Sequence, residues 1–120
     1  MNSPTRRFGN EGEDLVAQWL ESHGAIILHR NYQTRLGEVD IIATKGDVIA
    51  FVEVKTRNTE YFPISQTVTW SKQQRIIKAA KHFILYQRVI DKTYRFDVAT
   101  VVLDRGQNKI EYIKNAFCAP

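Results

Sequence analysis

The chain has 120 residues, close to the commonest size of a single domain, and its 43% hydrophobic content is enough for one buried core. Seventeen basic residues against thirteen acidic ones give a net charge of +4, which permits a phosphate-rich partner without requiring one. The single cysteine, Cys118, excludes a disulfide framework or a cysteine-based zinc site within one chain, and it fits a reducing, cytoplasmic setting.

Residues 1–9 are polar and are expected to form a flexible N-terminus, ahead of a single domain over residues 10–120. No apolar segment follows the basic residues at the start, and no apolar run is long enough to span a bilayer, so we expect neither a signal peptide nor a membrane partner. A helix is predicted to begin with Asn10 as its cap and to end before Gly24. Its apolar stripe comprises Leu15, Val16, Trp19 and Leu20.

Three strands are predicted next. Residues 25–32 form the first, and the apolar runs 35–43 and 48–55 flank a short polar turn, which is typical of a β-hairpin. Residues 56–70 have no clean period and predict a mobile loop. The aromatic residues Tyr61, Phe62 and Trp70 of this loop pack it onto the core or, alternatively, stack on unpaired bases.

A second helix is predicted from Ser71, with Gln74 completing a capping box, to about Arg88. Its expected buried face comprises Ile76, Ile77, Ala80, Phe83 and Ile84. Residues 94–103 contain an apolar run typical of a central strand, and residues 110–113 form a last, half-exposed strand. The order α-β-β-β-α-β-β predicts an α/β fold with a mixed sheet, with a helix on each face or both helices at its edge.

Charged residues interrupt the apolar strands of the hairpin at Asp40, Glu53 and Lys55. Charges in such positions are costly unless they are paired or bind a metal. Because side chains alternate along a strand, an even-length turn places Asp40 and Glu53 on one face, which Lys55 shares. A Gly46–Asp47 turn pairs the two acids directly, a Lys45–Gly46 turn leaves them diagonal, and an odd-length loop separates them.

The chemistry of these three side chains favours a metal site. Two neighbouring carboxylates stay ionised together only with a cation beside them, and oxygen ligands suit magnesium or manganese. The ammonium of Lys55 could stabilise a developing phosphate charge or position an attacking water, so the group suits phosphodiester hydrolysis. The alternative is a salt bridge of Lys55 with Glu53 or Asp40 on a solvated face, which the apolar neighbours disfavour.

An acidic residue in a strand, a hairpin and then Glu-x-Lys resembles the PD-(D/E)xK, or restriction-endonuclease-like, nuclease superfamily. The chain resembles more narrowly the YraN-like family of small bacterial proteins, through residues 12–13, 31–32, 37–43, 51–57 and 115–117. That resemblance covers most of the chain from Asn10 onwards. In size and element order the chain is also similar to the archaeal Holliday-junction resolvases, and the resemblance implies a restriction-endonuclease-like core.

The resemblance implies roles for individual residues. Asp40 and Glu53 match the metal-binding acids, and Lys55 matches the catalytic lysine. Glu13, on the first helix, matches a further acid that many such nucleases bring to the metal. Without the resemblance, Glu13 is better explained as an acid that the positive end of the helix dipole favours. Val39 stands where the superfamily's name has proline.

Basic residues around the hairpin predict a rim that binds nucleic-acid phosphates. Arg57 follows the motif, and Lys72 and Arg75 belong to the start of the second helix, which is expected near Lys55. The alternative is a solvated helix face, which is favoured for Lys78 and Lys81.

The sequence and the resemblance together predict a metal-dependent endonuclease-like protein that binds DNA, including branched or damaged DNA, with Mg²⁺ or Mn²⁺ as cofactor. A homodimer would fit, since cutting both strands of a duplex needs two sites. The alternatives are a non-catalytic nucleic-acid-binding module and a protein-interaction adaptor that keeps the nuclease fold.

Overall fold

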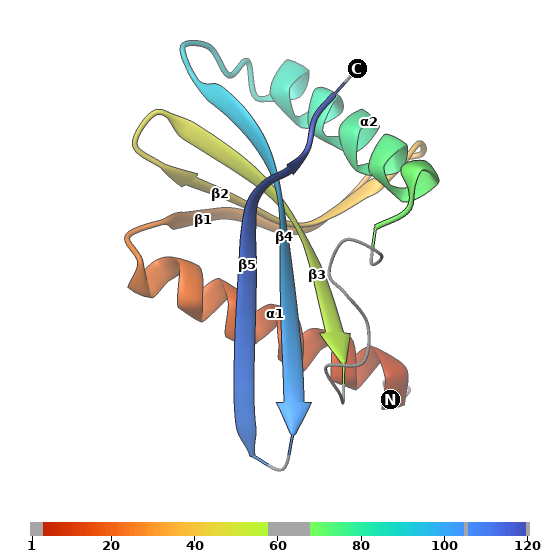
Figure 1. The fold of residues 1–120 in the computed structure, drawn as a ribbon. Helices are drawn as coiled ribbons and strands as arrows, with labels where there is room; N and C mark the ends of the chain where they lie inside the picture. Colours follow the sequence, from red (N-terminus) through yellow and green to blue (C-terminus); the bar gives the residue numbers. More distant parts are fainter. Residues whose placement is uncertain (1–3, 58–67, 105, 120) are drawn as a thin grey trace.

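The computed structural model describes residues 4–57, 68–104 and 106–119, with side chains described from Asn10 onwards. A five-stranded sheet has one helix on each face: α1 (Pro4–Ser22) on one side and α2 (Trp70–Tyr86) on the other (Figure 1). The predicted α/β fold with a mixed sheet and the order α-β-β-β-α-β-β is confirmed. In the described part of the chain, no helix combines the length and hydropathy that a bilayer crossing needs.

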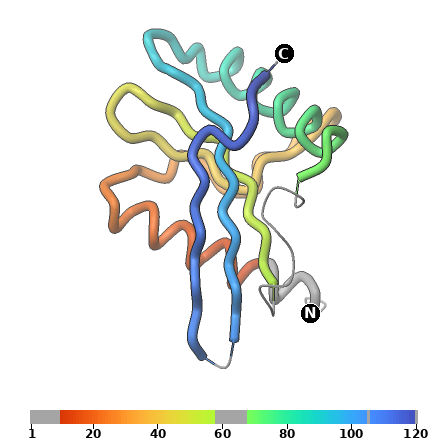
Figure 2. The backbone as a smooth tube through the Cα atoms, viewed as in Figure 1, coloured from red at the N-terminus to blue at the C-terminus, as the bar shows by residue number. Residues whose placement is uncertain are grey.

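The strands lie side by side in sequence order, β1 to β5. Their bounds are β1 Ile26–Gln33, β2 Glu38–Lys45, β3 Val48–Arg57, β4 Thr93–Asp104 and β5 Gln107–Phe117. Neighbours are antiparallel except β3 and β4, which are parallel because α2 lies between them in the chain. Figure 2 shows that the β4–β5 hairpin extends beyond the end of β3. The start of α2 lies beside Glu53, four residues before the end of β3.

The sheet divides the hydrophobic core into two clusters. Under α2, the helix residues Ile76 and Phe83 pack with Phe51 of β3. Under α1, Val16 and Leu20 pack with strand residues from β2, β3 and β4. The predicted helical stripes thus face the sheet, and helices on opposite faces explain why the central strands β3 and β4 are apolar on both sides.

The ends of both helices differ from the prediction. α1 begins at Pro4, so the cap predicted at Asn10 is wrong. Proline suits the first position of a helix because it lacks an N–H, and an N–H at that position would have no partner within the helix. The predicted flexibility of the N-terminus stays a prediction. The capping box predicted at Ser71 is also wrong, because the N-cap is Thr69, whose Oγ1 accepts from the Lys72 N–H at 3.1 Å.

The segment between β3 and α2 is shorter than predicted. β3 continues to Arg57 and α2 begins at Trp70, whose side chain is largely exposed. Tyr61 and Phe62 lie outside the described residues, so their predicted packing or stacking stays a prediction.

A buried carboxylate, Asp97, ties β5 to β4. It accepts hydrogen bonds from Arg95 Nε at 2.8 Å, Tyr112 Oη at 2.6 Å and the Asn115 N–H at 2.8 Å. Arg95 and Asp97 thus pair on the same strand. Burial, followed by the charge of Asp97, raises the pKa of the Tyr112 hydroxyl, so it remains a hydrogen-bond donor. The cluster therefore fixes Arg95 and Tyr112 in place.

Candidate functional site

The β2–β3 hairpin has the two-residue Gly46–Asp47 turn, because Lys45 pairs with Val48. Gly46 has a φ of +58°, which such tight turns require. The recorded pairing runs back to Ile41 and Val52, so it ends one residue short of Asp40 and Glu53. The structure therefore has the first of the two even-length turns considered from the sequence.

Asp40 lies where the backbone pairing of β2 and β3 ends. Its Oδ2 accepts the Val54 N–H at 2.8 Å, so a side chain continues the hydrogen bonding of the strands. Strict alternation does not hold here, since Val39 and Ile42 both pack in the cluster under α2. On the neighbouring strand, Asn31 has a φ of +54°, which marks the same irregularity.

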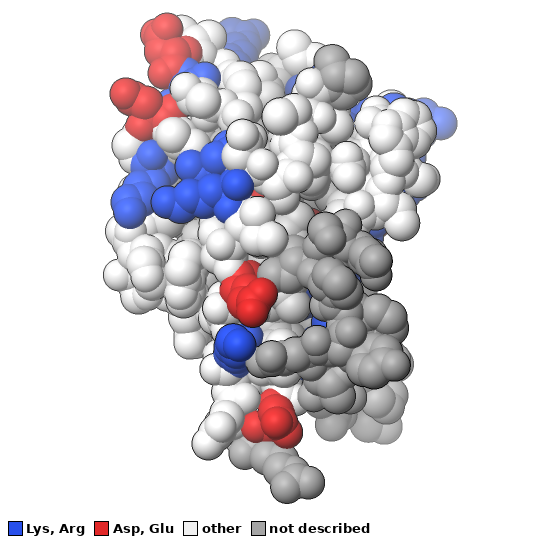
Figure 3. All heavy atoms as spheres, in the orientation of Figure 1, with Lys and Arg blue, Asp and Glu red and all other residues white. Residues whose placement is uncertain are grey.

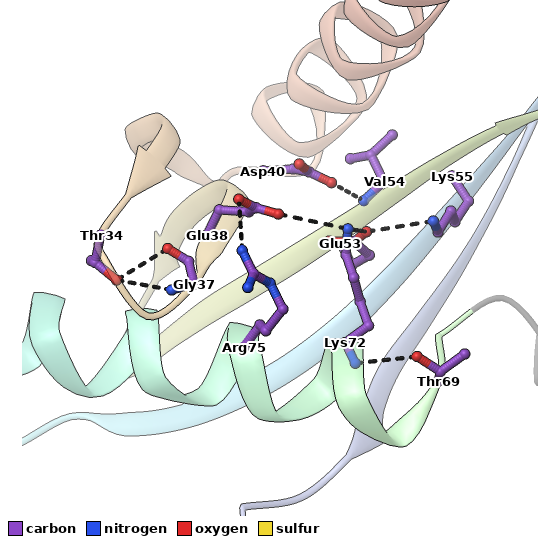
Figure 4. A network of polar contacts seen from close by, with 10 residues as sticks. All are labelled: Thr34, Gly37, Glu38, Asp40, Glu53, Val54, Lys55, Thr69, Lys72 and Arg75. Atoms are coloured by element: carbon purple, nitrogen blue, oxygen red, sulfur yellow. Dashed lines mark hydrogen bonds and ion pairs between the residues drawn. The ribbon is translucent and has the colours of Figure 1, made fainter.

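Glu53 is a buried acid with an incomplete set of partners. Its residue is 2% exposed, and none of the described residues donates a hydrogen bond to its Oε2. Its Oε1 lies 3.4 Å from Lys72 Nζ and 3.8 Å from Lys55 Nζ (Figure 4). Burial, followed by the charge of Asp40, raises the pKa of Glu53 to about 8, although both lysines act in the opposite direction. The two lysines therefore only partly offset the effects of burial and of Asp40 on the pKa of Glu53.

Two residues of α2 that were predicted to bind phosphates contact acids of the site. Lys72 Nζ lies between Glu53 and Glu38, 3.9 Å from Glu38 Oε1, and Arg75 Nη2 is 3.5 Å from Glu38 Oε2 (Figure 4). The cap on Thr69 places Lys72 in the first turn, facing the hairpin. The lysine contact with Glu53 was not expected from the sequence. Arg57, the last residue of β3, is half-buried and lies four residues after Glu53 in the strand.

Glu13 faces the same end of the hairpin from α1. It is 9% exposed, and burial, followed by the charge of Asp40, raises its pKa. Because α1 begins at Pro4, Glu13 lies beyond the first turn, where the helix dipole has little influence. The dipole explanation for this acid therefore loses its basis, and Glu13 and Glu53 both lie within electrostatic reach of Asp40.

Arg30 of β1 belongs to the site although no motif in the sequence points to it. Its Nη2 lies 3.5 Å from Glu13 Oε1 and 2.7 Å from Asp14 Oδ1. It lowers the pKa of Glu13 and so partly opposes the effects of burial and of Asp40. Arg30 pairs with Ile41 across the β1–β2 ladder, next to Asp40, and only that register could have revealed its position.

Gly12 brings α1 close to β3, next to Glu13. Gly12→Ala is expected to destabilise the protein by about 1–2 kcal/mol, because the new Cβ would overlap the Thr56 hydroxyl. Thr56→Ala removes that hydroxyl and should recover part of the loss in the double variant. Urea unfolding of the single and double variants measures this coupling. A loss that Thr56→Ala leaves unchanged would contradict the close contact.

The donor set suits a hard divalent cation. Asp40, Glu53 and Glu13 offer only carboxylate oxygens, and the orphaned Glu53 Oε2 is a buried acceptor that a cation would satisfy. Within the residues placed by the structure, no three His, Cys, Asp or Glu side chains are already gathered as a metal-binding group. The ammonium groups of Lys72 and Lys55 supply the positive charge around Glu53.

A family model and several relatives match this chain over most of its length. The model of "Uncharacterised protein family UPF0102" matches residues 12–101, a range that contains all the candidate site residues. A UPF0102 protein of Alkaliphilus metalliredigens is 45% identical over 114 residues, covering 94% of this chain and 99% of the relative. A UPF0102 protein of Geobacter metallireducens is 42% identical over 118 residues, covering 98% and 97% of the two chains.

Proposed function

The chain belongs to the uncharacterised protein family UPF0102, the YraN-like family, and we propose that it is a metal-dependent endonuclease-like protein that hydrolyses DNA phosphodiester bonds. One observation carries the proposal: Glu53 is buried beside Asp40, and its Oε2 has no hydrogen-bond donor among the residues that the structure describes. Most buried polar atoms of native proteins have a partner, and a bound cation would supply one here. Membership of the PD-(D/E)xK superfamily is part of the same proposal.

Asp40 and Glu53, with Glu13 beside them, would hold Mg²⁺ or Mn²⁺. A divalent ion bound there supplies Lewis-acid activation of water and stabilisation of the charge that develops on phosphate. Lys55 keeps its ammonium next to Glu53, where it can stabilise the same developing charge or position the attacking water. Asp40 is fixed by the Val54 N–H, which orients it without involving another titratable group.

DNA is the substrate class that fits the surroundings of these acids. Lys72 and Arg75 lie on the first two turns of α2, and Arg57 ends β3 four residues after Glu53. The contacts of Lys72 and Arg75 with Glu38 and Glu53 orient these two residues beside the acids, and phosphates would compete for them. Branched or damaged DNA is the proposed form of the substrate.

Cleavage assays test the proposal directly. The purified protein is incubated with branched, nicked and single-stranded DNA, with and without magnesium or manganese. We expect cutting that requires the metal and that Lys55→Ala slows by at least about 100-fold. Lys81→Gln, on the exposed side of α2, is the control and should leave the rate unchanged. The catalytic proposal fails if no substrate is cut, or if Lys55→Ala cuts as fast as the unchanged protein.

A non-catalytic nucleic-acid-binding module is the second candidate function. It is favoured by Lys72 and Lys55, which already provide positive charge beside Glu53 without a metal. This candidate predicts salt-sensitive DNA binding that survives Asp40→Asn and Glu53→Gln but weakens when Lys72 or Arg75 is replaced.

A further inference from the structure

A pocket lies on the α1 face of the sheet, near the C-terminal end of that helix. Its volume is about 300 Å³, at the lower end of the range for small-molecule pockets. Ala43 and Ala50, which are cross-strand partners on β2 and β3, contribute small side chains to its lining. Because α1 ends at Ser22, this part of the sheet is left with space above the alanines.

One wall of this pocket is aromatic. Trp19 stacks with His23 and with Tyr112, with ring centroids 4.0 Å and 4.8 Å apart. The stack is fixed from both sides, since Tyr112 donates to the buried Asp97 and His23 Nδ1 lies 2.7 Å from the Trp19 carbonyl oxygen. A fixed aromatic wall is a surface against which a planar base can pack.

The rim of the pocket is cationic. It includes Lys45 at the end of β2, Arg95 of β4 and Lys114 of β5. Asp97 holds Arg95 in a two-pronged contact, whereas neither Lys45 nor Lys114 has an ion-pair partner among the described residues. Figure 3 shows Lys and Arg side chains gathered beside β5, between the β2–β3 turn and the end of α1, with acidic side chains beyond them.

We infer that this pocket, the nucleotide pocket, binds one nucleoside phosphate. The base packs against the aromatic wall, and the phosphate lies between Lys45 and Lys114. Trp19 is six residues along α1 from Glu13, about 9 Å by helical rise, so the pocket is separate from the carboxylates and does not depend on the proposed hydrolysis. The nucleoside phosphate is either a free nucleotide or the terminal nucleotide of a strand.

Tryptophan fluorescence can follow binding at this pocket. The sequence contains only Trp19 and Trp70, so a Trp70→Phe protein reports on the pocket alone. Deoxyadenosine monophosphate is expected to change the Trp19 emission in a saturable way. Lys45→Gln and Lys114→Gln, each made in that background, should weaken binding about fivefold by removing one charged phosphate contact. Lys81→Gln is the matched control on α2 and should bind normally.

Further ligands separate the base from the phosphate and identify the source. Deoxyadenosine and inorganic phosphate are each expected to bind at least about tenfold more weakly than the nucleotide. A 5′-phosphorylated oligonucleotide that binds more tightly than the mononucleotide indicates a strand terminus, and equal affinity indicates a free nucleotide. Asp40→Asn should leave all these affinities unchanged. The assignment is overturned if the nucleotide signal does not saturate, or if the Lys114→Gln and Lys81→Gln proteins bind the nucleotide with equal affinity. It is also overturned if inorganic phosphate binds as tightly as the nucleotide.

Discussion

In the presence of magnesium, the Glu53→Gln protein is expected to cleave DNA at least about 1,000-fold more slowly than the unchanged protein while folding normally. The amide keeps the shape of the buried carboxyl group but removes the negative charge that the proposed metal needs. Because the raised pKa leaves Glu53 mostly protonated at neutral pH without metal, a neutral amide imitates the side chain that the metal-free fold already contains. Initial cleavage rates and urea unfolding, measured on the same preparation, test both halves of this expectation.

Glu111→Gln is the matched control for this experiment. It makes the same chemical change at an exposed carboxylate of β5, whose side chain is 52% exposed and paired with Lys109. We expect unchanged cleavage and unchanged stability. If Glu53→Gln cleaves as fast as Glu111→Gln, Glu53 has no part in the chemistry. If Glu53→Gln fails to fold, Asp40→Asn replaces the partner carboxylate and tests the same pair.

The free energy of unfolding of the metal-free protein is expected to fall as the pH rises from about 5 to 8. In the unfolded chain Glu53 releases its proton near its ordinary pKa of 4.5, whereas in the folded protein burial and Asp40 raise that pKa to about 8. Over this window the folded protein binds more protons than the unfolded chain, so raising the pH favours unfolding. Glu13 contributes in the same direction. The total loss should be a few kcal/mol, measured by urea unfolding at a series of pH values.

Two variants isolate the source of that pH dependence. Glu53→Gln removes the titrating group and should flatten most of the slope. Asp40→Asn removes the charge that raises the pKa of both Glu53 and Glu13, and should reduce the slope without abolishing it, because burial remains the larger cause. A slope that persists unchanged in Glu53→Gln would assign the pH dependence to other groups.

The carboxylate pair is predictable from the sequence because it depends on local geometry. A glycine-containing two-residue turn fixes the register of the hairpin, and the register fixes which side chains are opposite. Asp40 and Glu53 are thirteen residues apart and lie one residue beyond the recorded pair of Ile41 with Val52. The break in alternation at Val39 is the exception, since it arises from packing under α2.

The contacts that reach the pair from other elements are not predictable in this way. The approach of Lys72 to Glu53 depends on the residue at which α2 starts. Three hydroxyl residues just before Lys72 could each cap the helix: Thr67, Thr69 and Ser71. Packing of the whole helix on the sheet selects Thr69. Glu13 depends on the placement of α1, which spacing alone does not fix, and the resemblance to a known family supplied it. No motif or spacing in the sequence indicated that Arg30 contacts the site.

The parallel pairing of β3 with β4 has a consequence for the order of folding. The hairpin of β2 and β3 closes through a two-residue turn, and hairpins form within microseconds. The parallel pair requires α2 to dock first, and such non-local pairing is slow. Asp40 and Glu53 therefore meet before Lys72 arrives to offset their repulsion.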